Sequence, residues 1–319
     1  MSEEAGGTVL VTGAAGFVGS HLCDRLLAEG RRVVAIDDLS SGTIANLAEA
    51  RSYGKQFSFE HLDVRAEGLR SLFERHRPEV VMHLAAQASV KVSTSDPLFD
   101  ADVNVLGTIN VLQSAVRTEV RKIVYAASGG TIYGEPRRFP VKETAAPGGR
   151  PLSPYGVSKK VAGEYLALYQ RFKAIDHTAL ALGNVYGPRQ DPQGEAGVIA
   201  IFAGRMLVGE PCTINGDGNQ TRDYVFVADT VDAFSRAIDR GSGKLVNIGT
   251  GLETSVNLLY RMLAEIVGVE QEPEFGPLPS GEVRRIALDI SAAESELGWR
   301  PWTHLEDGLG ETVAFMKGV

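Results

Sequence analysis

The chain begins with a short apolar stretch, a glycine-rich turn and a helix-like segment. Thr8 to Val11 has the character of a buried strand, Gly13, Gly16 and Gly19 follow at three-residue spacing, and a helix is expected from Gly19 to Glu29. Such glycines permit a tight turn and let backbone N–H groups approach an anion at the positive end of a helix dipole. The pattern G-x-x-G-x-x-G, with its flanking strand and helix, predicts a pyrophosphate site in a parallel α/β sheet.

The same alternation continues through the first half of the chain. Short apolar runs alternate with helix-like segments after Asp63, over Asp100 to Thr118 and over Pro154 to Arg171. Runs that are apolar almost throughout are typical of parallel strands buried on both faces. The expected strands after the first are Arg32 to Ile36, Phe57 to His61, Val80 to Leu84, Lys122 to Ala126 and Thr178 to Leu182. The pattern predicts an α/β fold with a doubly wound parallel sheet of the Rossmann type.

A carboxylate ends the second expected strand. Asp37 lies about 20 residues beyond the glycine turn, where an acidic side chain binds the ribose hydroxyls of a dinucleotide. Asp38 follows, and the two carboxylates would repel a 2′-phosphate. The sequence therefore predicts NAD rather than NADP as the cofactor. The residues expected to bind it here are Gly13, Gly16, Phe17, Val18, Gly19 and Asp37.

After Val185 the regular alternation of expected strands and helices ends. A loop over residues 187–194 precedes an apolar helix candidate, Val198 to Leu207, and a turn-rich stretch and a long Pro- and Gly-rich loop follow. We expect an NAD-binding domain of residues 1–183 with part of 220–250. Residues 184–319 are expected to form a smaller, interleaved and discontinuous substrate-binding lobe.

Composition excludes several other classes of protein. With 32 Lys and Arg against 40 Asp and Glu, a net charge of −8 and no long basic cluster, the chain lacks the footprint of a nucleic-acid binder. Its apolar runs are strand-sized, and its acidic start does not resemble a signal peptide, so neither membrane insertion nor secretion is expected. Two cysteines, Cys23 and Cys212, indicate buried thiols in a cytoplasmic protein. The histidines lack metal-ligand spacing, so no metal is expected.

A tyrosine and a lysine four residues apart begin the expected helix at Pro154. Tyr155 and Lys159 would share one helix face. A nearby ammonium favours the phenolate, and the positive ring of an oxidised nicotinamide would act in the same direction. Tyr155 is therefore the candidate catalytic base and Lys159 its partner.

With these motifs the sequence resembles the extended short-chain dehydrogenase/reductase family and, within it, the nucleotide-sugar 4-epimerases. The resemblance covers nearly the whole chain. Beyond the glycine turn and the Tyr-Lys pair, it rests on Asp37 to Gly42, Asp63-Val64, His83 to Gln87, Asn104 to Thr108, Asn184 to Arg189 and Gln220 to Val225.

The resemblance implies further site residues. Asp63 and Val64 would border the adenine, Leu84, Ala85 and Ala86 would line the cofactor path, and Asn104, Tyr155 and Lys159 would contact the cofactor. The substrate residues implied are Gln87, Ser128, Thr131, Tyr155, Asn184, Arg189, Arg222 and Glu282. A homodimer is also implied, through the helices near Asp100 to Thr118 and Pro154 to Arg171.

One departure affects the catalytic group. Family epimerases carry Ser or Thr four residues before the Tyr of a Tyr-Gly pair, and here Gly129 stands four residues before Tyr133. Ser128 and Thr131 are the nearest hydroxyls and become the candidates for its role. Leu182-Gly183 also replaces an aromatic pair, and Pro279 stands where an Arg commonly precedes Gly-Glu.

The same loop bears on the reaction type. Related dehydratases carry an Asp-Glu pair there and related decarboxylases a Glu, whereas Gly130 and Thr131 supply neither. The expectation is thus an isomerase, an NAD-dependent 4-epimerase of UDP-sugars acting through a transient 4-keto sugar. A dehydratase, decarboxylase or net-redox dehydrogenase of the same family stays an alternative, as does a non-catalytic NAD-binding scaffold.

The sugar itself is left open. UDP-glucose and UDP-galactose are the default pair. Arg189, directly after Gly-Pro, could instead pair with the carboxylate of UDP-glucuronate or UDP-galacturonate.

Overall fold

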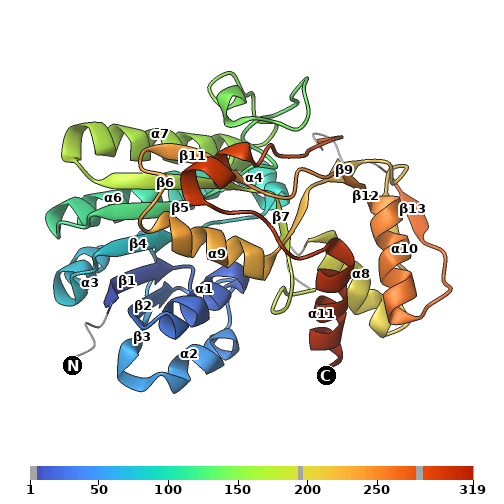
Figure 1. Ribbon diagram of the computed structural model, residues 1–319, viewed down its shortest axis with the longest axis horizontal. Helices are drawn as coiled ribbons and strands as arrows, with labels where there is room; N and C mark the ends of the chain where they lie inside the picture. Colours follow the sequence, from blue (N-terminus) through green and yellow to red (C-terminus); the bar gives the residue numbers. More distant parts are fainter. Residues whose placement is uncertain (1–5, 193–196, 278–282, 319) are drawn as a thin grey trace.

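A seven-stranded parallel sheet forms the centre of the structure, a computed structural model that describes residues 6–192, 197–277 and 283–318 (Figure 1). Every neighbouring pair of strands in this sheet is parallel. In spatial order the strands are β11 (Lys244–Ile248), β6 (Asp176–Leu182), β5 (Lys122–Ser128), β4 (Val80–His83), β1 (Gly6–Thr12), β2 (Arg31–Asp37) and β3 (Phe57–His61). The predicted doubly wound fold is confirmed, with the switch point between β1 and β4, where such sheets bind their ligands.

Helices cover both faces of the sheet because alternate strand residues point to opposite sides. Side chains of α1 and α9 pack with Val9 and Val33, whereas those of α3, α6 and α7 pack with Leu10 and Val34. The helices are α1 (Phe17–Ala28), α2 (Ala48–Ser52), α3 (Leu69–His76), α4 (Val90–Ser95), α5 (Pro97–Ala101), α6 (Gly107–Arg117), α7 (Pro154–Lys173), α8 (Val198–Leu207), α9 (Val227–Ala237), α10 (Val256–Val267) and α11 (Leu305–Lys317).

The second half adds three short strand pairs beside α8, α10 and α11 (Figure 1). These pairs are β7 (Asn184–Tyr186) with β10 (Tyr224–Phe226), β9 (Thr221–Arg222) with β12 (Thr254–Ser255), and β8 (Thr213–Asn215) with β13 (Glu274–Gly276). The division at residues 183 and 184 stays a prediction. No helix in the described part of the chain is long and apolar enough to cross a membrane.

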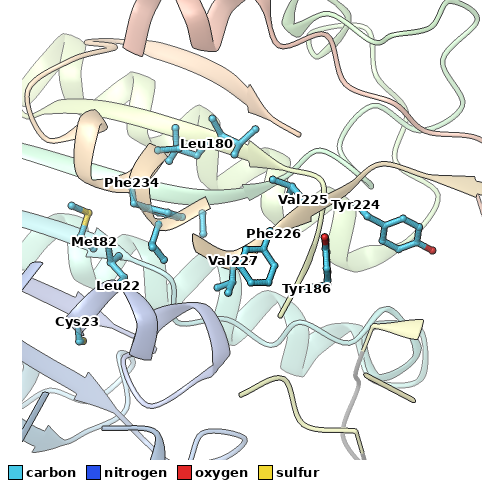
Figure 2. Close-up of a cluster of buried hydrophobic side chains, with 14 of the residues drawn as sticks. Leu22, Cys23, Met82, Leu180, Tyr186, Tyr224, Val225, Phe226, Val227 and Phe234 are labelled. Atoms are coloured by element: carbon cyan, nitrogen blue, oxygen red, sulfur yellow. The ribbon is translucent and has the colours of Figure 1, made fainter. Parts of the chain in front are cut away.

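One buried cluster runs from the sheet into this second half. Figure 2 shows Leu22 of α1 and Met82 of β4 near Phe234 of α9, with Val225 and Phe226 of β10 continuing the same cluster. Both cysteines are buried and unoxidised, as predicted; Cys23 belongs to this cluster too. The shared core fixes the position of β10, and thus of the neighbouring Arg222, relative to the sheet.

Two elements differ from the sequence-based expectation. The helix predicted over Asp100 to Thr118 is divided into α5, a π-helical turn over Asp102–Leu106, and α6. The turn carries Asn104, whose amide binds the backbone of Gln87 on both sides, and the widened helix accommodates that contact. The seventh strand, β11, was not predicted, because its run of five residues carries Asn247 in place of a fully apolar pattern.

Candidate active site

The glycine turn after β1 lies against the loop after β4. Gly13 has a φ of +68°, and a Cβ there would lie 2.7 Å from the backbone nitrogen of Ala85. At Gly19 a Cβ would meet the Gly13 carbonyl oxygen at 2.0 Å. Helix α1 begins at Phe17 with Gly16 as its N-cap and without a capping side chain, so its first-turn N–H groups remain for an anion. This turn fits the pyrophosphate of a dinucleotide.

Asp37 holds the same turn in place from β2. One carboxylate oxygen accepts the N–H of Ala15 at 2.9 Å and the other accepts that of Leu39 at 2.8 Å. Burial raises the pKa of Asp37, while these backbone hydrogen bonds lower it. Since a carboxylate has about four acceptor positions, Asp37 can still accept ribose hydroxyls.

Asp63, expected beside the adenine, is held by a residue that the sequence analysis did not single out. Arg65 binds the Asp63 carboxylate and also donates to Asp102 at 2.7 Å. These bonds lower the pKa of Asp63. Val64 is buried, and its carbonyl accepts from Asn110 at 2.7 Å. Asp63 therefore shapes this edge of the site as the partner of Arg65.

Three side chains and one backbone carbonyl form a hydrogen-bonded chain beside the loop after β4. Thr12 Oγ1 accepts the N–H groups of Leu84 and Ala85 and therefore donates its proton to His83 Nδ1 at 2.8 Å. His83 Nε2 donates to Thr108 Oγ1 at 3.0 Å, and Thr108 donates to the Asn104 carbonyl at 2.7 Å. Burial lowers the pKa of His83 to about 3, so His83 is neutral and ties β1, β4 and α6 together.

The side chain of Gln87, predicted to bind substrate, is used inside the protein. Its amide nitrogen donates to the Ser89 carbonyl and to Asp100, both at 2.9 Å, and its amide oxygen accepts the Ser89 N–H. The described contacts therefore give Gln87 a positioning role and do not support direct substrate binding.

Tyr155 and Lys159 lie where α7 passes the end of β5. Ser153 caps the helix by accepting the Gly156 N–H, and Pro154 occupies its first turn. The Lys159 ammonium lies 5.8 Å from the centre of the Tyr155 ring and donates to the Ala126 carbonyl at 3.0 Å. Burial raises the pKa of Tyr155 to about 12 and lowers that of Lys159 to about 8.

Ser128 supplies the hydroxyl beside Tyr155. It ends β5, and its hydroxyl lowers the pKa of Tyr155 against the effect of burial. A Cβ at Gly129 would lie 2.6 Å from Leu288 Cδ1 and 3.0 Å from two carbonyl oxygens, so this position points into the protein. Thr131 Oγ1 is buried and has no hydrogen-bond partner among the described residues.

The residues expected to hold the sugar diphosphate come together through β7, β9 and β10. Asn184 is paired with Tyr224 in the parallel β7–β10 ladder, and Arg222 ends β9 just before it. The Asn184 amide oxygen lies 3.9 Å from where a Cβ of Gly130 would be, which places it beside the Ser128–Thr131 loop. Glu282 lies outside the described residues.

Arg189 does not face the site as a free cation. It donates to Asp24 of α1 at 2.6 Å and lies 3.5 Å from Glu49, with only 17% of its side chain exposed. His21 of α1 bonds the neighbouring Pro188 carbonyl at 2.8 Å. The charge of Arg189 is thus matched inside the protein, and its pairing with a sugar carboxylate stays a prediction.

Comparison with known proteins agrees with this geometry. Residues 9–249 match the model of the NAD dependent epimerase/dehydratase family. The chain belongs to this family. It is 49% identical over 310 residues to a UDP-glucose 4-epimerase of Mycolicibacterium smegmatis. The aligned region covers 97% of this chain and 98% of the relative.

Solved structures of this family share the whole fold. A UDP-glucose 4-epimerase of Thermotoga maritima, solved with UDP-glucose, has a TM-score of 0.93 at 43% identity and covers 98% of this chain and 99% of its own. One from Thermus thermophilus, solved with NAD, has a TM-score of 0.90 at 40% identity, with the same two coverages. NAD is the cofactor of this family, and the glycine turn, Asp37, Tyr155 and Lys159 stay the residues predicted to hold it.

Sequence reasoning missed two residues of the site. The only sequence signal for Arg65 is its position two residues after Asp63. Asp100 is the first residue of the predicted helix and belongs to no recognised motif. Both are recognisable only when strands and helices far apart in the chain meet.

Proposed function

We propose that this protein is an NAD-dependent 4-epimerase of UDP-sugars, with UDP-glucose and UDP-galactose as its pair. The observation that carries the proposal is the placement of Tyr155 beside the buried Lys159, whose ammonium lies 5.8 Å from the centre of the tyrosine ring, in a dinucleotide fold. Similarity to UDP-glucose 4-epimerases over nearly the full length supports the same substrate.

Tyr155 acts as the base toward the sugar 4-hydroxyl. Its phenolate takes the hydroxyl proton while the hydride leaves the 4-carbon, which leaves a 4-keto sugar. After the sugar turns over, a hydride returns to the opposite face of the 4-carbon and Tyr155 gives a proton back to the 4-oxygen. NAD, when bound, holds the hydride between the two transfers and ends the cycle unchanged.

Lys159 and Ser128 prepare Tyr155 for this role. The Tyr155 pKa of about 12 belongs to the protein without cofactor, and the positive nicotinamide ring together with the Lys159 ammonium favours the phenolate. The Ser128 hydroxyl is proposed to bridge Tyr155 and the sugar 4-hydroxyl. Asn184 and Arg222 are proposed to hold the diphosphate.

The contacts of Arg189 favour a neutral sugar. A uronate carboxylate would need a desolvated cation, and Arg189 is paired with Asp24 instead. The related dehydratases are disfavoured because Gly130 and Thr131 take the place of their Asp-Glu pair.

We also propose a homodimer in the cytoplasm. Apolar side chains are exposed on α7 at helical spacing, Val157, Leu168 and Phe172, and on α5, Leu98 and Phe99. An apolar groove between the two helices, lined by Pro97, Ala101 and Leu152 among others, gives a second copy a place to insert such side chains. The two buried, unoxidised cysteines support the cytoplasmic location.

The experiment is turnover of UDP-glucose and, separately, UDP-glucuronate by the purified protein, with the 4-epimers resolved by chromatography. Wild type is expected to form UDP-galactose. Tyr155→Phe is expected to lose at least about 10³-fold in kcat while still binding NAD. Near-wild-type turnover by that variant would refute the assignment of the base.

A further inference from the structure

Asp100 is a fully buried carboxylate that the reaction described above does not use. It lies on α5 with 0% of its surface exposed. One oxygen accepts the side-chain N–H groups of Gln87 at 2.9 Å and Asn104 at 3.0 Å. The other accepts the hydroxyl proton of Ser158 at 2.6 Å. Asp100 thus connects the loop after β4 and the π-helical turn to the helix that carries the catalytic pair.

Ser158 makes the connection to that pair direct. It lies next to Lys159 and three residues after Tyr155, on the same part of α7. A bond that fixes Ser158 therefore fixes the rotation of α7 at the turn where Tyr155 must face the substrate. Asn104 and Gln87, the other partners of Asp100, hold the loop that lines the predicted cofactor path.

The charges around this network are few. His83 of β4 is neutral, since burial and Lys159 lower its pKa to about 3, and Tyr125 of β5 is neutral, since burial raises its pKa far above the usual value. On α7 the Tyr155 phenol and the Lys159 ammonium remain. Asp100 is the carboxylate whose charge acts on both of them, and it raises the pKa of each.

We propose that Asp100 is a positioning residue for the Tyr155–Lys159 pair, serving as the fixed counter-charge of the Lys159 ammonium and locking α7 onto the loop after β4. A buried ammonium without a nearby anion is costly, and the charge of Asp100 offsets part of that cost. The inference rests on the proposed function for the role of Tyr155, but the charge pairing itself does not.

The charge balance shows why a permanent anion suits this reaction. In the first half-reaction the phenolate gains a proton as a hydride leaves the sugar carbon for the oxidised cofactor, so one negative and one positive charge disappear together. Lys159 and Asp100 are unchanged and cancel each other. The buried site is then neutral both before and after the transfer, whereas without Asp100 it would carry one positive charge throughout.

The substitution Asp100→Asn separates the charge from the hydrogen bonds. The asparagine oxygen can accept from Gln87 and Asn104, and its NH₂ can donate to the Ser158 oxygen, so all three contacts can persist. Ser158→Ala does the opposite, because it removes one contact and keeps the charge. Glu164→Gln, at an exposed carboxylate of the same helix, is the matched control for a general loss of one negative charge.

The pH profiles of kcat and of NAD binding test the prediction. Loss of the anion lowers the pKa of both Tyr155 and Lys159, so in Asp100→Asn both limbs of the kcat profile for UDP-glucose move to lower pH by about one unit. NAD binding is expected to weaken at alkaline pH as Lys159 loses its proton, and in Asp100→Asn this weakening, measured by calorimetry on protein freed of nucleotide, should also move to lower pH. Ser158→Ala lowers kcat without moving either limb, and Glu164→Gln changes neither profile.

Outcomes of this experiment separate the two hypotheses. Unmoved limbs and an unmoved NAD profile in a folded Asp100→Asn protein would overturn the role of Asp100. An absence of UDP-galactose with a shifted NAD profile would instead overturn the proposed function alone. If Asp100→Asn is too unstable to assay, adding Lys159→Met should raise its melting temperature, and failure to do so would also overturn the pairing.

Discussion

At the scale of single residues, Ser128 is the candidate to replace the hydroxyl that family epimerases carry at position 129. Ser128 ends β5 and its hydroxyl lowers the pKa of Tyr155, whereas Thr131 Oγ1 is buried without a partner among the described residues. Ser128, one position earlier in the chain, is thus the proposed source of the hydroxyl beside Tyr155. Glycine at position 129 is therefore compatible with a hydroxyl beside Tyr155.

We therefore expect Ser128→Ala to lower kcat about 10²-fold or more, since the hydroxyl that aids proton transfer is lost. Thr131→Ala is expected to lower kcat less, because that hydroxyl has no hydrogen-bond partner among the described residues. Steady-state turnover of UDP-glucose measures both variants. Equal kcat for Ser128→Ala and wild type would contradict the role of Ser128.

Gly129→Ser, which recreates the family pattern, is expected to harm the protein rather than improve it. Its Cβ would meet Leu288 and the carbonyl oxygens of Ala181 and Leu182 at 2.6 to 3.0 Å. Overpacking of this kind costs about 1–3 kcal/mol. Denaturant unfolding gives the free energy of unfolding, and a variant as stable as wild type with higher turnover would show that position 129 faces the sugar.

The sequence predicted most of these residues but not their contacts. Tyr155 and Lys159 lie close together because four residues make about one helical turn, a spacing visible in any sequence. Whether Ser128 or Thr131 replaces the hydroxyl depends on the end of β5 and its twist relative to α7. The contacts of Asp100 with Ser158 and of Arg65 with Asp102 could not be predicted, because each joins residues far apart in the chain.

At the scale of elements, α1 is fastened to the loop after β7. His21 bonds the Pro188 carbonyl at 2.8 Å, and Arg189, in the left-handed region at a φ of +67°, reaches Asp24 at 2.6 Å. Helix α1 carries the glycine turn at its beginning, so these bonds join the proposed phosphate site to the substrate lobe. The sequence showed both segments but not that they meet.

Arg189→Ala is expected to lower turnover of any UDP-sugar the enzyme accepts by the same factor. The change removes the tie to Asp24 and costs about 2 kcal/mol of folding free energy, without removing a contact to the sugar. Denaturant unfolding and parallel assays with neutral and acidic sugars measure both effects. A selective loss with UDP-glucuronate would restore Arg189 as a carboxylate partner.

At the scale of the whole molecule, the apolar surface of α5 and α7 predicts association. Leu168 and Phe172 lie one turn apart on α7, and Phe172 is 66% exposed. A double substitution, Leu168→Glu with Phe172→Glu, is expected to give a monomer, since charges oppose burial at an interface. Analytical ultracentrifugation measures the mass of each species.

Phe275→Glu is the matched control for that experiment. Phe275 is 61% exposed on β13, away from α5 and α7, so the variant should sediment as wild type does. A wild-type monomer, or a dimer that survives the double substitution, would contradict the proposed interface.

The central claim is that hydride leaves and returns to the same sugar carbon while Tyr155 carries the proton. Its most direct test is conversion of UDP-glucose labelled with deuterium at C4. The product UDP-galactose should keep its deuterium at C4, as mass spectrometry and NMR would show. Loss of the label to solvent, or no UDP-galactose at all, would contradict the account.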